Sequence, residues 1–294
     1  MIAKKIKKTI LNEMEKRRLL FGGSDAKFSK SLDIAPAQYS RIKNGDIEKV
    51  LSDANWISLA RRLGVSLYGT PEWKTAKTPV FEYITAQLEK CQQESFSSLL
   101  CDLSDIGKTY TAVYYAKTHK NVVYVDCSQV KSKQRLIRHI AKGFGSESKG
   151  RYEDVYEDLS YYLKTLQKPL IIFDEAGDLD YTAFLEIKAL WNAVESCCGF
   201  YMMGADGLKE KIRRAIEGKK VGYTELFSRF GKRYGKVVPE GREEAERMLR
   251  VTALLIIKAN AEEGVDAKSL MQKTIGSDNR PNLRCIGKEL LKLN

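Results

Sequence analysis

The sequence predicts an α/β protein: a doubly wound parallel sheet, preceded by a small all-helical domain and followed by further helices. Three observations lead to this prediction. Short apolar runs alternate with helical patterns of roughly 10–15 residues in the middle of the chain. The N-terminal quarter contains only short helical patterns separated by turn signals. The residues after Pro239 again show only helical periodicity.

We divide the 294 residues into a helical domain at 1–68, a linker at 69–78, an α/β core at 79–238 and a helical lid at 239–294. Two prolines, a glycine and small polar residues break the helical pattern in the linker. A chain of this length more often forms two domains than one.

Composition limits the classes of function. The formal net charge of +12 suggests an acidic partner, with nucleic acid as the first candidate. Six scattered cysteines without a CxxC pair, and only two histidines, argue against a zinc site and a disulfide framework. No run of 18 apolar residues exists. We therefore expect a cytoplasmic protein that does not insert into a membrane.

The stretch from Ser97 to Thr111 has the pattern of a phosphate-binding loop. An apolar run leads into a polar turn, and Gly107 then opens a helix whose first N–H groups can face an anion. Lys108 would reach the outer phosphates of ATP, and the Thr109 hydroxyl would hold Mg²⁺. The expected nucleotide-binding residues of this loop are Ser104, Asp105, Ile106, Gly107, Lys108, Thr109 and Tyr110.

Two carboxylates depart from the usual loop. Asp102 stands where the pattern GxxxxGK[ST] has its first glycine, and Asp105 stands where many such loops have a small residue. A carboxylate beside a triphosphate would repel it. We therefore expect either weak nucleotide binding or a reshaped loop.

A second motif follows downstream. Leu170 to Phe173 form an uninterrupted apolar run, as in a strand that is buried on both faces of a parallel sheet. The run ends in Asp174 and Glu175, and ligands of open α/β sheets bind at the carboxyl ends of the strands. Asp174 can hold Mg²⁺, while Glu175 can orient the attacking water as a catalytic residue.

Three further residues are candidates for sensing or stabilising phosphate. Asp206 follows a predicted strand and either senses the γ-phosphate or caps the next helix. Arg229 suits an arginine finger that reaches a neighbouring subunit, with Lys232 and Arg233 as alternatives for this role. A solvated side chain or a contact with a DNA phosphate is the simpler explanation. Arg284 in the last helix could touch the γ-phosphate or belong to a basic face.

Residues 5–67 resemble the helix-turn-helix of the phage-repressor-like class, on the stretch AKFSKSLDIAPAQYSRIKNG. Two short helices, 26–32 and 37–43, flank a tight turn. A small helical bundle for protein contacts remains the alternative. The resemblance places the following residues toward DNA: Gln38, Tyr39, Ser40, Arg41 and Lys43.

Residues 78–294 resemble an AAA+ ATPase on the motifs IGKT and LIIFDEAGDL, with a predicted helical lid. Joined to the N-terminal helices, they resemble the target-selecting ATPases of DNA transposition, the phage Mu transposition protein B type. The resemblance implies ATP and Mg²⁺ as cofactors, and ATPase roles for Lys108, Thr109, Asp174 and Glu175. It also implies ATP-dependent, largely sequence-neutral assembly on double-stranded DNA, as a filament or ring, and contact with a transposase.

Two other classes of function stay open at this point. The protein could be a nucleotide-gated DNA-binding regulator without any role in transposition. It could also be a degenerate ATPase that acts as an interaction scaffold. The response of DNA binding to ATP distinguishes these classes.

Overall fold

The computed structural model describes residues 2–67 and 73–292. Its centre is a four-stranded parallel sheet with strand order β1-β4-β3-β2. The strands are β1 (Ser97–Cys101), β2 (Val122–Asp126), β3 (Leu170–Asp174) and β4 (Gly199–Gly204). The predicted α/β fold, with helices before and after a parallel sheet, is confirmed.

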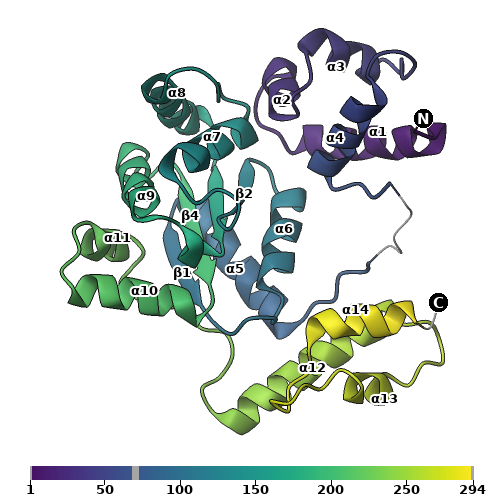
Figure 1. Ribbon diagram of the computed structural model, residues 1–294, viewed down its shortest axis with the longest axis vertical. Coiled ribbons are helices and arrows are strands. Elements are labelled where there is room, and N and C mark those ends of the chain that lie inside the picture. The colour runs from purple at the N-terminus through teal and green to yellow at the C-terminus, as the bar shows by residue number, and fades with distance from the viewer. Residues whose placement is uncertain (1, 68–72, 293–294) are drawn as a thin grey trace.

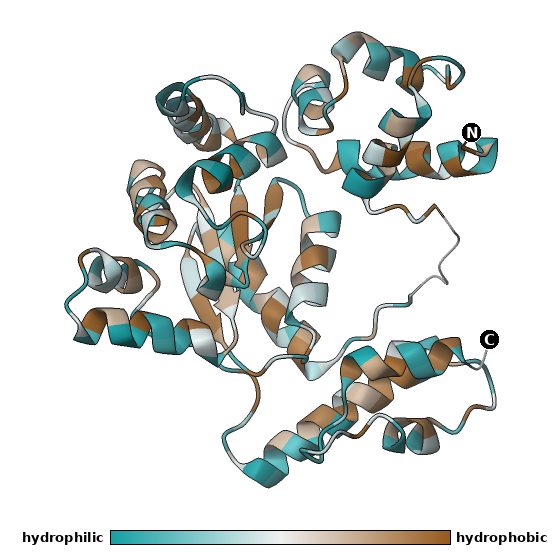
Figure 2. Ribbon diagram, in the orientation of Figure 1, coloured by the Kyte–Doolittle hydropathy of each residue, from teal (hydrophilic) through white to brown (hydrophobic). Residues whose placement is uncertain are grey.

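Helices cover both faces of the sheet (Figure 1). The strands are accordingly mostly hydrophobic (Figure 2). Alternate residues of β3 enter different cores. Leu170 and Ile172 pack with the helices of one face, and Ile171 and Phe173 with those of the other. The first face carries α5 (Pro79–Glu94) and α6 (Lys108–Thr118). The second carries α7 (Lys133–Phe144), α8 (Tyr152–Thr165), α9 (Tyr181–Ala193), α10 (Asp206–Glu217) and α11 (Tyr223–Arg229).

Residues 233–238, whose sequence RYGKVV also suggests a short strand, contribute only a single bridge to the sheet. Gly235 pairs in parallel with Leu100, its N–H donating to the carbonyl of Leu99 at 2.7 Å. The next N–H groups, of Val237 and Val238, instead donate to the carboxylate of Asp102. A side chain therefore replaces the strand partner, and the segment lies beside β1 without extending the ladder.

The N-terminal region forms a helical unit with its own core around the fully buried Trp56. Ser24 and Ser52 cap α2 and α4 by accepting hydrogen bonds from backbone N–H groups. The four helices are α1 (Lys4–Leu19), α2 (Asp25–Ser31), α3 (Pro36–Lys43) and α4 (Asp53–Leu63). α2 and α3 flank the short turn that the sequence predicts.

The structure does not leave Tyr39 available for DNA. Its side chain is 3% exposed and packs edge-on against Phe28, with ring centroids 5.6 Å apart. Tyr39 lies one position before Ser40, which is exposed, so the two side chains occupy different faces of α3. The aromatic ring is a core residue that joins α2 to α3.

Ion pairs join the N-terminal unit to the α/β core, as does a backbone hydrogen bond from the N–H of Asn121 to the carbonyl of Leu20 at 3.1 Å. The Asp33 carboxylate accepts from Arg62 of its own unit and from Lys142 of α7, both at 2.5 Å. Lys30 pairs with Glu147 at 3.2 Å. Of the predicted linker at 69–78, residues 69–72 lie outside the described part of the chain, as does the predicted boundary at residue 68.

Three C-terminal helices form the predicted lid below the sheet in Figure 1. They are α12 (Arg242–Asn260), α13 (Ala267–Gln272) and α14 (Leu283–Leu291), with Ile257 and Ile286 fully buried between them. The helical pattern of the sequence continues to Leu293, which lies outside the described residues. Among the described residues, no helix combines the length and apolar character that crossing a membrane requires.

The burial of Tyr39 makes a testable prediction. Tyr39→Ala removes an aromatic ring from the N-terminal core and should lower the free energy of unfolding of this unit by about 3–5 kcal/mol. Urea denaturation measures the change, followed by tryptophan fluorescence in a background in which Trp73 and Trp191 are replaced by phenylalanine, so that Trp56 alone reports. The neighbouring control Ser40→Ala should change it by less than about 0.5 kcal/mol. Equal effects of the two substitutions would contradict the buried position.

Candidate functional site

The phosphate-binding loop connects β1 to α6, as the sequence predicts. Gly107 precedes the first helical residue with φ of 100°, in the left-handed region that glycine adopts without strain. α6 therefore begins at Lys108, and its free N–H groups face the loop. The Lys108 ammonium donates to the carbonyls of Asp102, at 3.0 Å, and of Leu103. Burial lowers the pKa of Lys108, although nearby carboxylates oppose this shift.

The loop meets β3 at a buried carboxylate. Asp174 is 1% exposed, and its Oδ2 accepts a hydrogen bond from Thr109 Oγ1 at 2.6 Å. The same oxygen accepts from the hydroxyl of Tyr124, at the end of β2, at 2.9 Å. The sequence predicted the meeting of Thr109 and Asp174. It missed Tyr124. The only signal for this residue was its position near the end of the neighbouring strand, β2.

Glu175 follows Asp174 directly, and its backbone turns away from the direction of β3. Its φ of 50° lies in the left-handed region, which costs a non-glycine residue about 1–2 kcal/mol. The side chain is exposed and lines the same cavity as the loop. Partial burial, followed by the charge of Asp174, raises the pKa of Glu175. A raised pKa makes this carboxylate a better proton acceptor than an ordinary glutamate.

These residues face a cavity of about 280 Å³ between the α/β core and the lid. One wall is the loop from Ser104 to Thr111, so all the predicted loop residues line the cavity, and Glu175 lines it as well. The opposite wall is mostly apolar and includes the exposed ring of Trp73, from the predicted linker. That wall consists of Trp73, Ala76, Thr78, Phe81, Ile256, Leu283 and Arg284.

Asp102 does not point into this cavity. Its carboxylate is fully buried and accepts three backbone hydrogen bonds, from Leu103 at 2.7 Å, Val237 at 2.6 Å and Val238 at 2.9 Å. The geometry therefore does not support the expected repulsion between Asp102 and a triphosphate in this cavity. Asp102 instead anchors the segment that leads from the sheet into the lid.

Asp105 ties the loop to the lid from the other end. Its carboxylate accepts from the N–H of Leu283 at 2.8 Å, at the start of α14, and lies 3.6 Å from Arg284 Nε. Partial burial raises the pKa of Asp105, which the contacts with α14 only partly offset. Arg284 lines the cavity, as expected for a lid arginine, but its side chain is 83% exposed and faces Asp105.

Asp206 and Arg229 do not line the cavity. Asp206 is the first residue of α10. Ala205 occupies the N-cap position, and no side chain accepts a capping hydrogen bond there. The alternative of Asp206 as the helix cap is therefore wrong. Arg229 lies against α9, where its guanidinium is 5.2 Å from the ring centre of Trp191 and donates to Asn192 at 2.7 Å. Within one chain it cannot act on this cavity.

The remaining residues predicted to face DNA lie on or near the surface of the N-terminal unit. Ser40 is exposed. Arg41 pairs with Asp46 at 2.6 Å, and Lys43 pairs with Asp25 at 2.8 Å. The Gln38 side chain accepts from the N–H of Ala35 and donates to the carbonyl of Val50, so it is used within the fold.

The donor set fits a magnesium ion that arrives with a nucleotide. Within the described residues, no group of three or more histidine, cysteine, aspartate or glutamate side chains could hold a metal by itself. Thr109 and Asp174 offer one hydroxyl and one carboxylate. Mg²⁺ in proteins commonly takes one or two such ligands and completes its shell with phosphate oxygens and water.

Comparison with known families agrees with this geometry. Residues 97–212 match the model of the AAA domain family, so this segment, from β1 into α10, is an AAA domain of the P-loop NTPase type. No curated protein matches the chain.

The role of Asp102 can be tested by restoring the usual glycine. Asp102→Gly leaves the N–H groups of Val237 and Val238 without their acceptor, and hydrogen bonds to a charged group contribute about 1.5–3 kcal/mol each. We expect a lower melting temperature and weaker ATP binding in calorimetry, with Asp102→Asn intermediate. Tighter ATP binding by Asp102→Gly would contradict the anchoring role.

Proposed function

We propose that the protein is a Mg²⁺-dependent ATPase whose ATP-bound form assembles on double-stranded DNA and directs a transposase to it. One observation carries the ATPase part. The loop residue Thr109 donates a hydrogen bond to the buried strand-end residue Asp174, and Thr109 lines the same cavity as Lys108 and Glu175. These are the groups that phosphoryl transfer requires.

Each group has a defined task in this proposal. The N–H groups at the start of α6 and the Lys108 ammonium bind phosphate oxygens. Thr109 and Asp174 hold Mg²⁺, which offsets the negative charge of the phosphates when it is bound. Glu175 accepts a hydrogen bond from the attacking water and orients it toward the γ-phosphate. The apolar wall around Trp73 suits the base of the nucleotide.

Assembly of several copies is part of the proposal because Arg229, the candidate arginine finger, does not line the cavity of its own chain. Arg229 is held by Trp191 and Asn192 at the outer side of α9. From there its charge could act on the nucleotide of a neighbouring copy, which would make ATP binding and assembly mutually dependent. Asp206 at the end of β4 remains a candidate sensor of the γ-phosphate.

Net charge and the N-terminal helices support DNA as the partner. The chain has a formal net charge of +12, and phosphate contacts made by lysine and arginine are independent of sequence. Arg41 and Lys43 are engaged in exposed ion pairs, which contribute little to stability and can exchange for contacts with DNA phosphates. The resemblance to target-selecting ATPases supports the transposase as the second partner.

The experiment measures binding to random-sequence duplex DNA with ATP, with ADP and without nucleotide. We expect ATP to raise the affinity at least tenfold, and added salt to weaken the binding strongly. Glu175→Gln should slow hydrolysis about 100-fold or more and prolong the lifetime of the DNA complex, because ATP remains bound. Lys108→Ala is the control that loses the response to ATP.

Two results would contradict the proposal in different ways. Binding to one operator sequence that ignores ATP would instead favour a DNA-binding regulator. An unchanged ATP affinity of Lys108→Ala in calorimetry would favour a scaffold that does not use this loop.

A further inference from the structure

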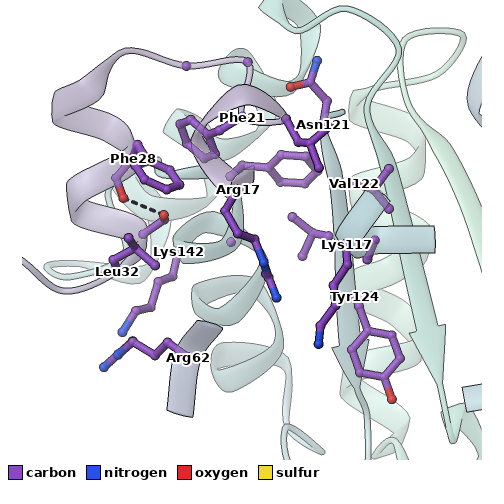
Figure 3. Close-up of a pocket in the computed structure, with 18 of the residues that line it drawn as sticks. Arg17, Phe21, Phe28, Leu32, Arg62, Lys117, Asn121, Val122, Tyr124 and Lys142 are labelled. Atoms are coloured by element: carbon purple, nitrogen blue, oxygen red, sulfur yellow. Dashed lines mark hydrogen bonds between the residues drawn. The ribbon is translucent and has the colours of Figure 1, made fainter. Parts of the chain in front are cut away.

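A second cavity, of about 590 Å³, lies between the N-terminal unit and the α/β core. Figure 3 shows residues of both parts around it. α1 and α4 contribute one side, and α6, α7 and β2 contribute the other. Its size lies within the range of about 300–1,000 Å³ that is typical of small-molecule sites. This cavity is distinct from the one between the phosphate-binding loop and the lid, because no residue lines both.

The lining is strongly cationic. Arginine and lysine side chains enter from both sides, and no aspartate or glutamate lines the cavity. Two nearby carboxylates pair with some of these cations: Glu13 with Arg17, and Asp33 with Arg62 and Lys142. The cations outnumber these two carboxylates. The basic lining residues are Arg17, Arg61, Arg62, Lys117 and Lys142.

Several donors in this cavity remain unused. The Nε atom of Arg62 is buried and has no hydrogen-bond partner among the described residues. Arg17 Nε also makes no hydrogen bond there, but it lies 3.7 Å from Glu13 Oε1, and Arg17 Nη2 donates to the carbonyl of Leu63 at 3.5 Å. Within the described residues, the Lys117 ammonium makes no hydrogen bond or ion pair. It lies against Gly64 of the N-terminal unit, where a β-carbon would be 3.0 Å away. An anion between the two parts would pair with the Lys117 ammonium and with the charge of the Arg17 guanidinium.

Helix ends account for some of this charge but not for the unused donors. Arg17 and Lys117 lie in the last turns of α1 and α6, where a cation offsets the negative end of the helix dipole. An exposed lysine in a last turn has the same benefit and keeps its donors in water. Lys164 at the end of α8 is such a residue.

Flat side chains lie beside the cations. Phe21 and Tyr124 line the cavity and can contact a planar group of a ligand. Tyr124 also reaches the nucleotide site, because its hydroxyl donates to Asp174. Tyr124 and Thr109, which line different cavities, therefore donate to the same oxygen of Asp174.

From this combination we infer that the cavity between the N-terminal unit and the core binds a phosphate ester of nucleotide size. Arg17 and Lys117 hold its phosphate oxygens from opposite sides, and Phe21 contacts its base. This site is additional to the proposed ATPase site and does not depend on Lys108.

The test uses the full chain with the Lys108→Ala substitution and titrates it with ATP in a calorimeter. We expect about one equivalent of ATP to bind at this site. Adding Lys117→Gln should weaken this binding at least tenfold, and Arg17→Gln should do the same. The matched control Lys164→Gln also removes a lysine from a last helix turn and should leave the binding unchanged. Melting temperatures confirm that the variants fold.

Three outcomes would overturn the inference: no ATP binding by Lys108→Ala, binding that Lys117→Gln leaves intact, or an equal loss in Lys164→Gln. Failure of the proposed ATPase site gives a different result. In that case the chain with Lys108 intact and the Lys108→Ala chain bind the same single equivalent of ATP, and Lys117→Gln alone abolishes it.

Discussion

The hydrogen bond from Thr109 to Asp174, at 2.6 Å, is the contact on which the candidate site depends. It joins the start of α6 to the end of β3, two segments that are 65 positions apart in the sequence. Parallel pairing makes this possible, because all four strands end at the same edge of the sheet. Burial of Asp174 strengthens the contact, since charged groups interact more strongly away from water.

The lid is held to this edge by the two carboxylates that distinguish the loop. Asp102 binds the backbone at Val237 and Val238, and Asp105 binds the start of α14. A glycine at position 102 would have no side-chain oxygen to accept the hydrogen bonds from Val237 and Val238. The loop therefore has carboxylates in place of the usual small residues, and these carboxylates fix its junction with the lid. Fixing this junction also positions the lid residues that line the cavity.

Much of the fold followed from local patterns in the sequence. The apolar run at Leu170 to Phe173 identified a strand buried on both faces, and the order of Lys108, Thr109, Asp174 and Glu175 placed the site at the strand ends. These features are local, because periodicity and strand termini determine them. The sequence does not define which way a side chain turns in a loop. For this reason it could not predict the backbone N–H groups that donate to Asp102.

Other differences have the same origin in long-range packing. Tyr39 lies in a short helix whose buried face depends on where Phe28 packs, and a polar aromatic residue suits either face. The partners of Arg229, Trp191 and Asn192, come from another helix. Tyr124 acquires its contact with Asp174 only because β2 pairs with β3. Tertiary pairing decided each of these positions, and the roles of Arg229 and Asp206 stay predictions.

The central claim is that the phosphate-binding loop and β3 together hold ATP with Mg²⁺. Calorimetric titration with ATP, with and without Mg²⁺, of the unmodified chain and of Thr109→Val tests it most directly. We predict that Mg²⁺ tightens ATP binding at least tenfold in the unmodified chain, and that Thr109→Val loses most of this gain. An ATP affinity that ignores Mg²⁺, or the same gain in both proteins, would contradict the claim.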